Sequence, residues 1–157
     1  MIHFKSAEGV FNFRSVAVII HQGYVLLHQQ RGDDFWALPG GRVEWFEDSA
    51  TTVVREIQEE LGQTATVVRP LWHAENFFGF DGKRFHELST YYLMALVDSN
   101  LPFGEAAFSG VEADVDLIFK WFPIDELAAE PLYPEFLREK LSSLPEGVEF
   151  IRVNELD

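Results

Sequence analysis

Short β-branched and aliphatic runs recur along the chain and predict strands. They lie at residues 14–20, 24–29, 64–74, 85–97 and 115–122. The run at 85–97 is nearly apolar throughout, as is typical of a strand in the middle of a sheet. His21-Gln22-Gly23 and Asp81-Gly82 place glycine at two short connections, and both predict hairpin turns. Residues 1–13 are expected to form an arm or a leading strand.

A helical spacing replaces this pattern between residues 48 and 61. The apolar positions there recur at steps of three and four and draw one stripe: Ala50, Val53, Val54, Ile57 and Leu61. Asp48 or Ser49 can cap the start of this helix, and Gly62 stands where a C-cap glycine belongs. A short helix is predicted after Pro123 and a final one over 134–144, with loops over 31–41 and 100–114.

Strands and helices therefore interleave, which predicts an α/β fold with a mixed sheet between helices, in a single domain over residues 1–157. The 12 basic and 26 acidic residues give a net charge of −14, which argues against DNA and anionic lipid as partners. The chain has no cysteine, so disulfides and thiolate metal sites are excluded. With no signal-like start and no apolar run of about 20 residues, we expect a cytoplasmic protein with no membrane partner.

Acidic residues crowd one side of the predicted 48–61 helix. With Ala50 at 0° and about 100° per residue, Glu59, Glu56 and Glu60 fall at roughly 180°, 240° and 280°, beside the apolar stripe. Each like-charge pair at these spacings costs an isolated helix about 0.2–0.5 kcal/mol. The cluster is therefore either a solvated face or a site for a hard cation such as Mg²⁺ or Mn²⁺. Glu47, just before the helix, can hold Arg55 by a bidentate contact.

The spacing of these residues carries a family resemblance. The pattern G-x5-E-x7-R-E-U-x-E-E-x-G-U, where U is bulky and aliphatic, is matched by Gly41, Glu47, Arg55, Glu56, Ile57, Glu59, Glu60 and Gly62. The final U is Gln63, which departs from the pattern and leaves the acidic set intact. The chain thus resembles the Nudix hydrolases, with the box at residues 41–63 and a likeness over about 14–141. That resemblance implies the Nudix α/β/α sandwich.

The resemblance also implies a chemistry. Nudix proteins hydrolyse a phosphoanhydride bond in a nucleoside diphosphate linked to another group, here expected to be a nucleoside triphosphate, a nucleotide sugar or a similar small molecule. The implied cofactor is Mg²⁺, with Mn²⁺ as a substitute. Glu56 and Glu60 are the implied metal ligands, with Glu59 as a further ligand or the base, and the Gly40 or Gly41 carbonyl as another ligand. Arg55 and Glu47 are expected to hold the loop onto the helix.

Several assignments stay open. The general base could instead be Glu105, Glu112 or Asp114 in the 100–114 loop, although a solvated acid is the more common role for a loop residue of this kind. Arg31 and Glu87 are candidate substrate contacts, and the basic residues Arg42, Lys83 and Arg84 are further candidates for contact with phosphate. The phenylalanines at 77, 78, 80 and 85 could stack a base, form a homodimer patch or fill the core. The alternative functions are a nucleotide-sensing module without catalysis and an RNA cap pyrophosphohydrolase. The intact carboxylates argue against the first, and the acidic charge argues against the second.

Overall fold

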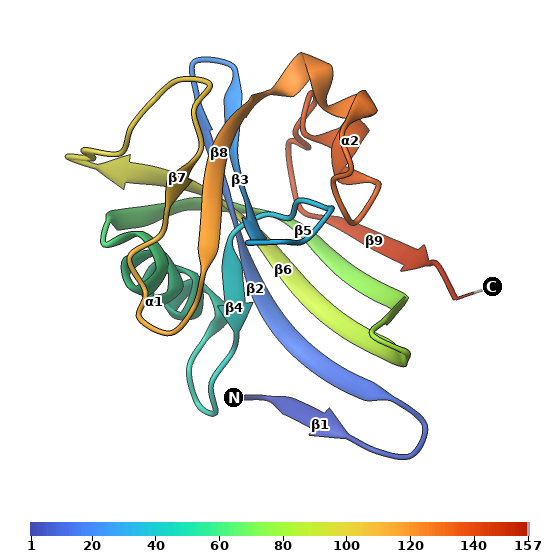
Figure 1. Cartoon of the computed structure of the whole chain (residues 1–157). Helices are drawn as coiled ribbons and strands as arrows, with labels where there is room; N and C mark the ends of the chain where they lie inside the picture. The colour runs from blue at the N-terminus through green and yellow to red at the C-terminus, as the bar shows by residue number, and fades with distance from the viewer. Residues whose placement is uncertain (157) are drawn as a thin grey trace.

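A mixed sheet forms the centre of the computed structural model, which describes residues 1–156 (Figure 1). The strands are β1 (His3–Lys5), β2 (Val10–His21), β3 (Tyr24–Gln30), β4 (Gly40–Arg42), β5 (Thr64–Phe80), β6 (Lys83–Val97), β7 (Phe108–Ser109), β8 (Leu117–Pro123) and β9 (Glu149–Asn154). Their order is β7-β8-β3-β2-β6-β5-β9, and β1 and β4 both pair with β2. The helices are α1 (Ser49–Leu61), the 3₁₀ helix η1 (Ile124–Ala129) and α2 (Leu137–Lys140).

The two predicted hairpins are present, and their turns explain their sequences. Gln22 and Gly23 have φ of 49° and 81°, and Asp81 and Gly82 have φ of 51° and 72°. Positive φ at both central residues is the backbone of a turn that matches strand twist, and glycine or a short polar residue adopts it most readily. Strand β6 lies between β2, to which it is parallel, and β5, to which it is antiparallel. Its predicted central position is therefore confirmed.

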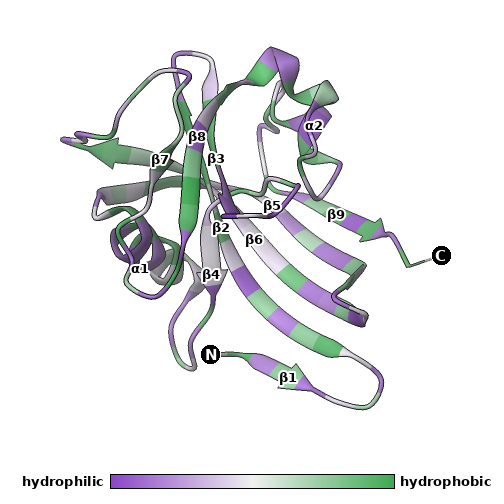
Figure 2. Ribbon diagram, in the orientation of Figure 1, coloured by the Kyte–Doolittle hydropathy of each residue, from purple (hydrophilic) through white to green (hydrophobic). Residues whose placement is uncertain are grey.

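Helices cover both faces of the sheet, so the predicted α/β class is confirmed. Helix α1 packs Val53, Ile57 and Leu61 against one face in a buried apolar cluster. Its start is capped by Asp48, whose Oδ1 accepts from the Thr51 amide at 2.8 Å, and it ends at Gly62 with φ of 64°. The opposite face packs against buried side chains of η1, α2 and their flanking segments, among them Leu127 and Leu137. Much of α1 has the purple colour of hydrophilic residues in Figure 2, as expected for a helix that buries only one face.

Several elements differ from the sequence expectation. The final helix is only Leu137–Lys140, and turns flank it on both sides within the predicted 134–144 segment. Strand β4 begins within the predicted 31–41 loop and extends one residue beyond it, and β7 lies within the predicted 100–114 loop. Strand β9 was not predicted and pairs in parallel with the edge of β5. No helix in the described part of the chain is both long and apolar enough to cross a bilayer.

Candidate active site

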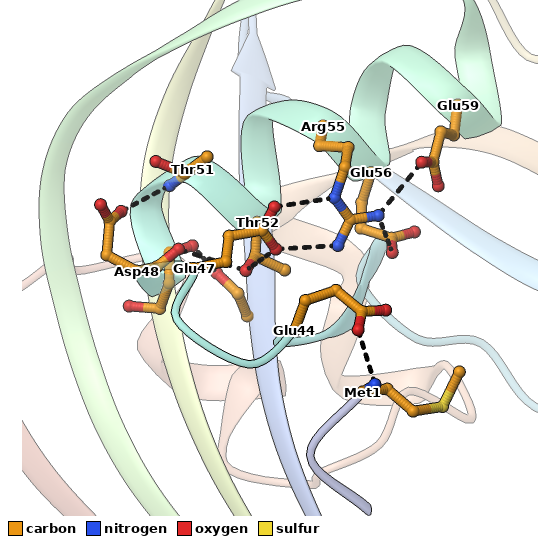
Figure 3. A network of polar contacts seen from close by, with 11 residues as sticks. Met1, Glu44, Glu47, Asp48, Thr51, Thr52, Arg55, Glu56 and Glu59 are labelled. Atoms are coloured by element: carbon orange, nitrogen blue, oxygen red, sulfur yellow. Dashed lines mark hydrogen bonds and ion pairs between the residues drawn. The ribbon is translucent and has the colours of Figure 1, made fainter.

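A single guanidinium organises the start of helix α1. Arg55 Nε and Nη2 donate to Glu47 Oε2 and Oε1 at 3.0 and 2.9 Å, so the predicted bidentate contact is present (Figure 3). Thr52 Oγ1 donates to the same Glu47 Oε1 at 2.6 Å. These hydrogen bonds, first from Arg55 and then from Thr52, lower the pKa of Glu47 to about 2. Glu47 is thus held as a carboxylate, which ties the loop before the helix to its second turn.

The third nitrogen of Arg55 holds two further acids. Nη1 lies 3.1 Å from Glu56 Oε1 and 3.1 Å from Glu59 Oε1. Figure 3 shows both carboxylates turned toward the guanidinium. The Glu56 side chain is 15% exposed and burial raises its pKa, whereas the Glu59 side chain is 45% exposed. One cation therefore gathers three of the predicted acidic residues.

Glu60 is the acid that Arg55 does not reach. It is 4% exposed, and its Oε2 has no hydrogen-bond partner among the described residues. Burial, reinforced by the charge of Glu56, raises the pKa of Glu60 to about 9. A buried polar oxygen without a partner costs about 1–3 kcal/mol, and more when it is charged. The helical angle explains the burial, because Glu60 falls nearest the apolar stripe.

The residues present fit a divalent cation. Glu60 brings a buried oxygen that has no partner in the described part of the chain, and Glu56 lies close enough to raise the pKa of Glu60. Hard cations prefer such carboxylate oxygens. Within residues 1–156, no group of three or more acidic or histidine side chains is already gathered as a metal site. Arg55 instead holds Glu56 and Glu59, and a bound cation would compete with it for them.

The two glycines before the helix have different neighbours. A methyl group on Gly40 would overlap the Ser15 carbonyl oxygen in β2, whereas one on Gly41 would overlap the Glu56 carboxyl group. Gly40 therefore permits the close pairing of β4 with β2, opposite Val16. Gly41 permits the close approach of β4 to the acidic side of α1.

A cavity of about 750 Å³ opens beside Gly41. Because Gly41 both lines this cavity and touches Glu56, the acidic cluster lies at the edge of the cavity. The aromatic lining residues are Phe35, Phe78, Phe80, Phe85 and Tyr133, and the polar ones include Asn12, Arg14, Arg42, Asn76 and Glu87. The volume falls within the usual range for small-molecule sites, about 300–1,000 Å³.

The other predicted residues are divided by this geometry. Glu87 lines the cavity and is 7% exposed. Arg31 lies outside the cavity lining and pairs with Asp116 at 2.8 Å, with more than half of its side chain exposed. Of the alternative bases, Glu112 is close enough for its charge to raise the pKa of Glu56 and Glu60.

Sequence reasoning missed several lining residues. Asn12 and Arg14 are polar residues at alternate positions near the start of β2, so their side chains share one face of that strand. Asn76 occupies an equivalent face of β5 and is 7% exposed. Two polar residues spaced by two were the available signal for Asn12 and Arg14.

Comparison with known proteins identifies the family. The NUDIX domain family matches residues 12–142. The Mycobacterium tuberculosis protein named MutT4 is 30% identical over 106 residues, 68% of this chain and 40% of that protein, so the chain spans less than half of this curated relative. The crystal structure of a MutT Nudix hydrolase from Burkholderia pseudomallei has a TM-score of 0.65 at 28% identity and covers 83% of this chain and 98% of its own. An ADP-ribose pyrophosphatase from Streptococcus suis shares the fold, with a TM-score of 0.58, 20% identity and coverage of 90% and 98%. The chain belongs to the Nudix hydrolase family.

Proposed function

We propose that this chain is a divalent-metal-dependent pyrophosphohydrolase that cleaves a phosphoanhydride bond in a nucleoside diphosphate linked to another group. The observation that carries the proposal is the buried oxygen of Glu60, which has no hydrogen-bond partner among residues 1–156 and lies beside Glu56 at the edge of a cavity large enough for a nucleotide. The similarity to a MutT Nudix hydrolase over most of both chains supports the same class of reaction.

The roles proposed for the acidic residues follow from their burial and contacts. Glu56 and Glu60 would hold Mg²⁺ or Mn²⁺, with Glu59 or the Gly40 carbonyl as further ligands. When bound, the ion supplies charge neutralisation on the phosphate oxygens and activation of the attacking water. Arg55 and Glu47 fix the loop to the first turns of α1, which would keep the proposed carboxylate ligands close to one metal ion.

The proposed reaction needs one proton acceptor. Water attacks a phosphorus atom, the bridging P–O bond breaks, and the oxygen that bridged the two phosphates leaves on the other product. The proton released by water passes to a carboxylate. Glu59, which is half-exposed and 3.1 Å from Arg55, is our first candidate, and Glu112 is the alternative, because its charge acts on both Glu56 and Glu60.

The experiment is turnover of a panel of nucleoside diphosphate derivatives with Mg²⁺, Mn²⁺ or EDTA. We expect activity with either metal, none in EDTA, and a loss in kcat of about 10²-fold or more for Glu60→Gln with folding intact. Glu126→Gln, an exposed acid of η1, is the control and should retain full activity. Nucleotide binding without turnover in every metal condition would instead support a sensing module.

A further inference from the structure

Three polar side chains form a row across the centre of the sheet. Asn12 on β2 lies directly opposite Glu87 on β6, and Glu87 lies directly opposite Asn76 on β5. The three are between 4% and 7% exposed, and all of them line the large cavity. Ala74 and Tyr91, further along this face, belong to the buried apolar cluster, whereas Ser89 and Arg14 beside the row are polar. A polar row continuing an apolar face is costly unless it has partners.

The hydrogen bonds within the row leave it incomplete. Asn12 Nδ2 donates to Glu87 Oε2 at 3.3 Å, and Ser89 Oγ donates to Glu87 Oε1 at 3.1 Å. Asn76 Oδ1 is buried and has no hydrogen-bond partner within residues 1–156. Each carboxylate oxygen can accept more than one hydrogen bond. The row therefore offers unused acceptors to the cavity, at Glu87 and Asn76.

Aromatic rings stand around these acceptors. Phe78 and Phe85 stack with ring centroids 5.0 Å apart at the end of the β5–β6 hairpin. Phe35 packs edge-on against both Phe80 and Tyr133, at 6.2 and 6.3 Å. Flat apolar surfaces around a hydrogen-bonding floor suit a flat heterocycle that stacks on rings and presents a polar edge.

The row also has a fixed place relative to the acidic cluster. Arg14 lies two residues beyond Asn12 on the same face of β2 and directly opposite Arg42 on β4. Gly41, which precedes Arg42 in β4, lies against Glu56. The cavity thus passes from the acceptor row to two guanidinium groups and then to the carboxylates. Phosphates would lie beside the arginines, and a ring beside Glu87.

We propose that Glu87 and Asn76 read the edge of the substrate's nucleobase and select bases whose edge carries N–H donors. This inference rests on the proposed function in taking a nucleotide as the ligand. A carboxylate can only accept, so the base must donate. Guanine presents a ring N–H and an amino group side by side, which match two carboxylate oxygens. Adenine and cytosine present an amino group, and uracil presents one N–H between two carbonyl oxygens that Glu87 would repel.

Binding of nucleoside monophosphates, measured by calorimetry in EDTA, tests this selection apart from hydrolysis. We expect GMP to bind about tenfold more tightly than UMP, with AMP and CMP between them. IMP, which lacks only the amino group of guanine, should bind more weakly than GMP. In Glu87→Gln, which keeps the size of the side chain and adds a donor, the GMP-to-UMP ratio should fall to about threefold or less. Asn76→Leu should lower it as well.

Glu75→Gln is the matched control, because Glu75 neighbours Asn76 on β5 but is exposed on the other face. It should retain the full ratio, and thermal unfolding should show that each variant is folded. UMP binding as tightly as GMP, a ratio unchanged in Glu87→Gln, or no binding of any of these nucleotides at millimolar concentration would overturn the inference. Selective binding of GMP by a protein that hydrolyses nothing would instead overturn the proposed function and leave the base selection standing.

Discussion

The contact between Gly41 and Glu56 allows a sharp test by one methyl group. A Cβ at Gly41 would overlap the Glu56 carboxyl group, while the backbone of Gly41 is not in the left-handed region and tolerates alanine. In Gly41→Ala the flexible end of Glu56 therefore has to move, and the backbone does not. The substitution displaces a proposed metal ligand without removing any chemical group.

The size of the effect follows from the displacement required. Ordinary carbon contacts are about 3.5–4.0 Å, so the carboxyl group must retreat by more than about 1 Å. A misplacement of about 1 Å in a reacting constellation can cost about 10²-fold in rate. We expect kcat of Gly41→Ala to fall by about that factor. The free energy of unfolding should fall by less than about 1.5 kcal/mol, because only the 3.1 Å contact of Glu56 with Arg55 is lost.

Gly40→Ala is the matched control, because it should reduce stability more than Gly41→Ala does. Its methyl group would overlap the backbone of Ser15 and Val16 in β2, which cannot move away as a side-chain end can. We expect it to lower the free energy of unfolding by about 2 kcal/mol or more. The assay is calorimetric unfolding together with kcat at saturating substrate and Mg²⁺. Wild-type kcat in Gly41→Ala, or equal destabilisation by both substitutions, would refute the reasoning.

Two further predictions concern stability. Arg55→Ala should lower the free energy of unfolding by about 1–3 kcal/mol and also reduce turnover, because it removes the bidentate partner of Glu47. Loss of the exposed ion pair of Arg31 should lower it by less than about 1 kcal/mol. Equal losses in chemical denaturation would contradict this prediction. Burial lowers the pKa of His28 to about 3, so its neutral form stabilises the fold fully above pH 6.5, and that contribution is lost as the pH falls from 6.5 toward 3. At pH 5 the free energy of unfolding should be lower by about 2 kcal/mol on this account. The measurement compares the pH dependence of the free energy of unfolding in the wild type and in His28→Leu, since Glu60 titrates in both proteins. Parallel curves for the two proteins would exclude this contribution of His28.

Local patterns in the sequence were enough for the elements whose stability is local. Helix α1 has a stripe of apolar residues, a capping Asp48 and a terminal Gly62, and each agrees with the others. Strand β9 is an edge strand whose sequence does not alternate strictly, because Phe150 and Ile151 are adjacent and Phe150 is 83% exposed. Its pairing with β5 therefore depends on tertiary contacts rather than on its own pattern. The predicted 134–144 helix was too long for a similar reason. Its apolar residues reach the core from turns as well as from a helix, so their spacing did not fix the length of the helix.

The candidate site divides in the same way. Glu47 lies just before the helix and only eight residues from Arg55, so a short stretch of chain was enough to predict their bidentate contact. Angles around the helix also order the exposure of Glu59, Glu56 and Glu60. The row of Asn12, Glu87 and Asn76 joins positions up to 75 residues apart, and only strand order and register bring it together. No spacing along one sequence could have shown it.

The central claim is that Glu56 and Glu60 together hold a divalent cation. Electron paramagnetic resonance of Mn²⁺ added to the metal-free protein measures that binding directly, without substrate or turnover. The account predicts saturable Mn²⁺ binding by the wild type, an affinity lower by about tenfold or more in Glu60→Gln, and no change in Glu126→Gln. Equal Mn²⁺ affinity in the wild type and Glu60→Gln would contradict it.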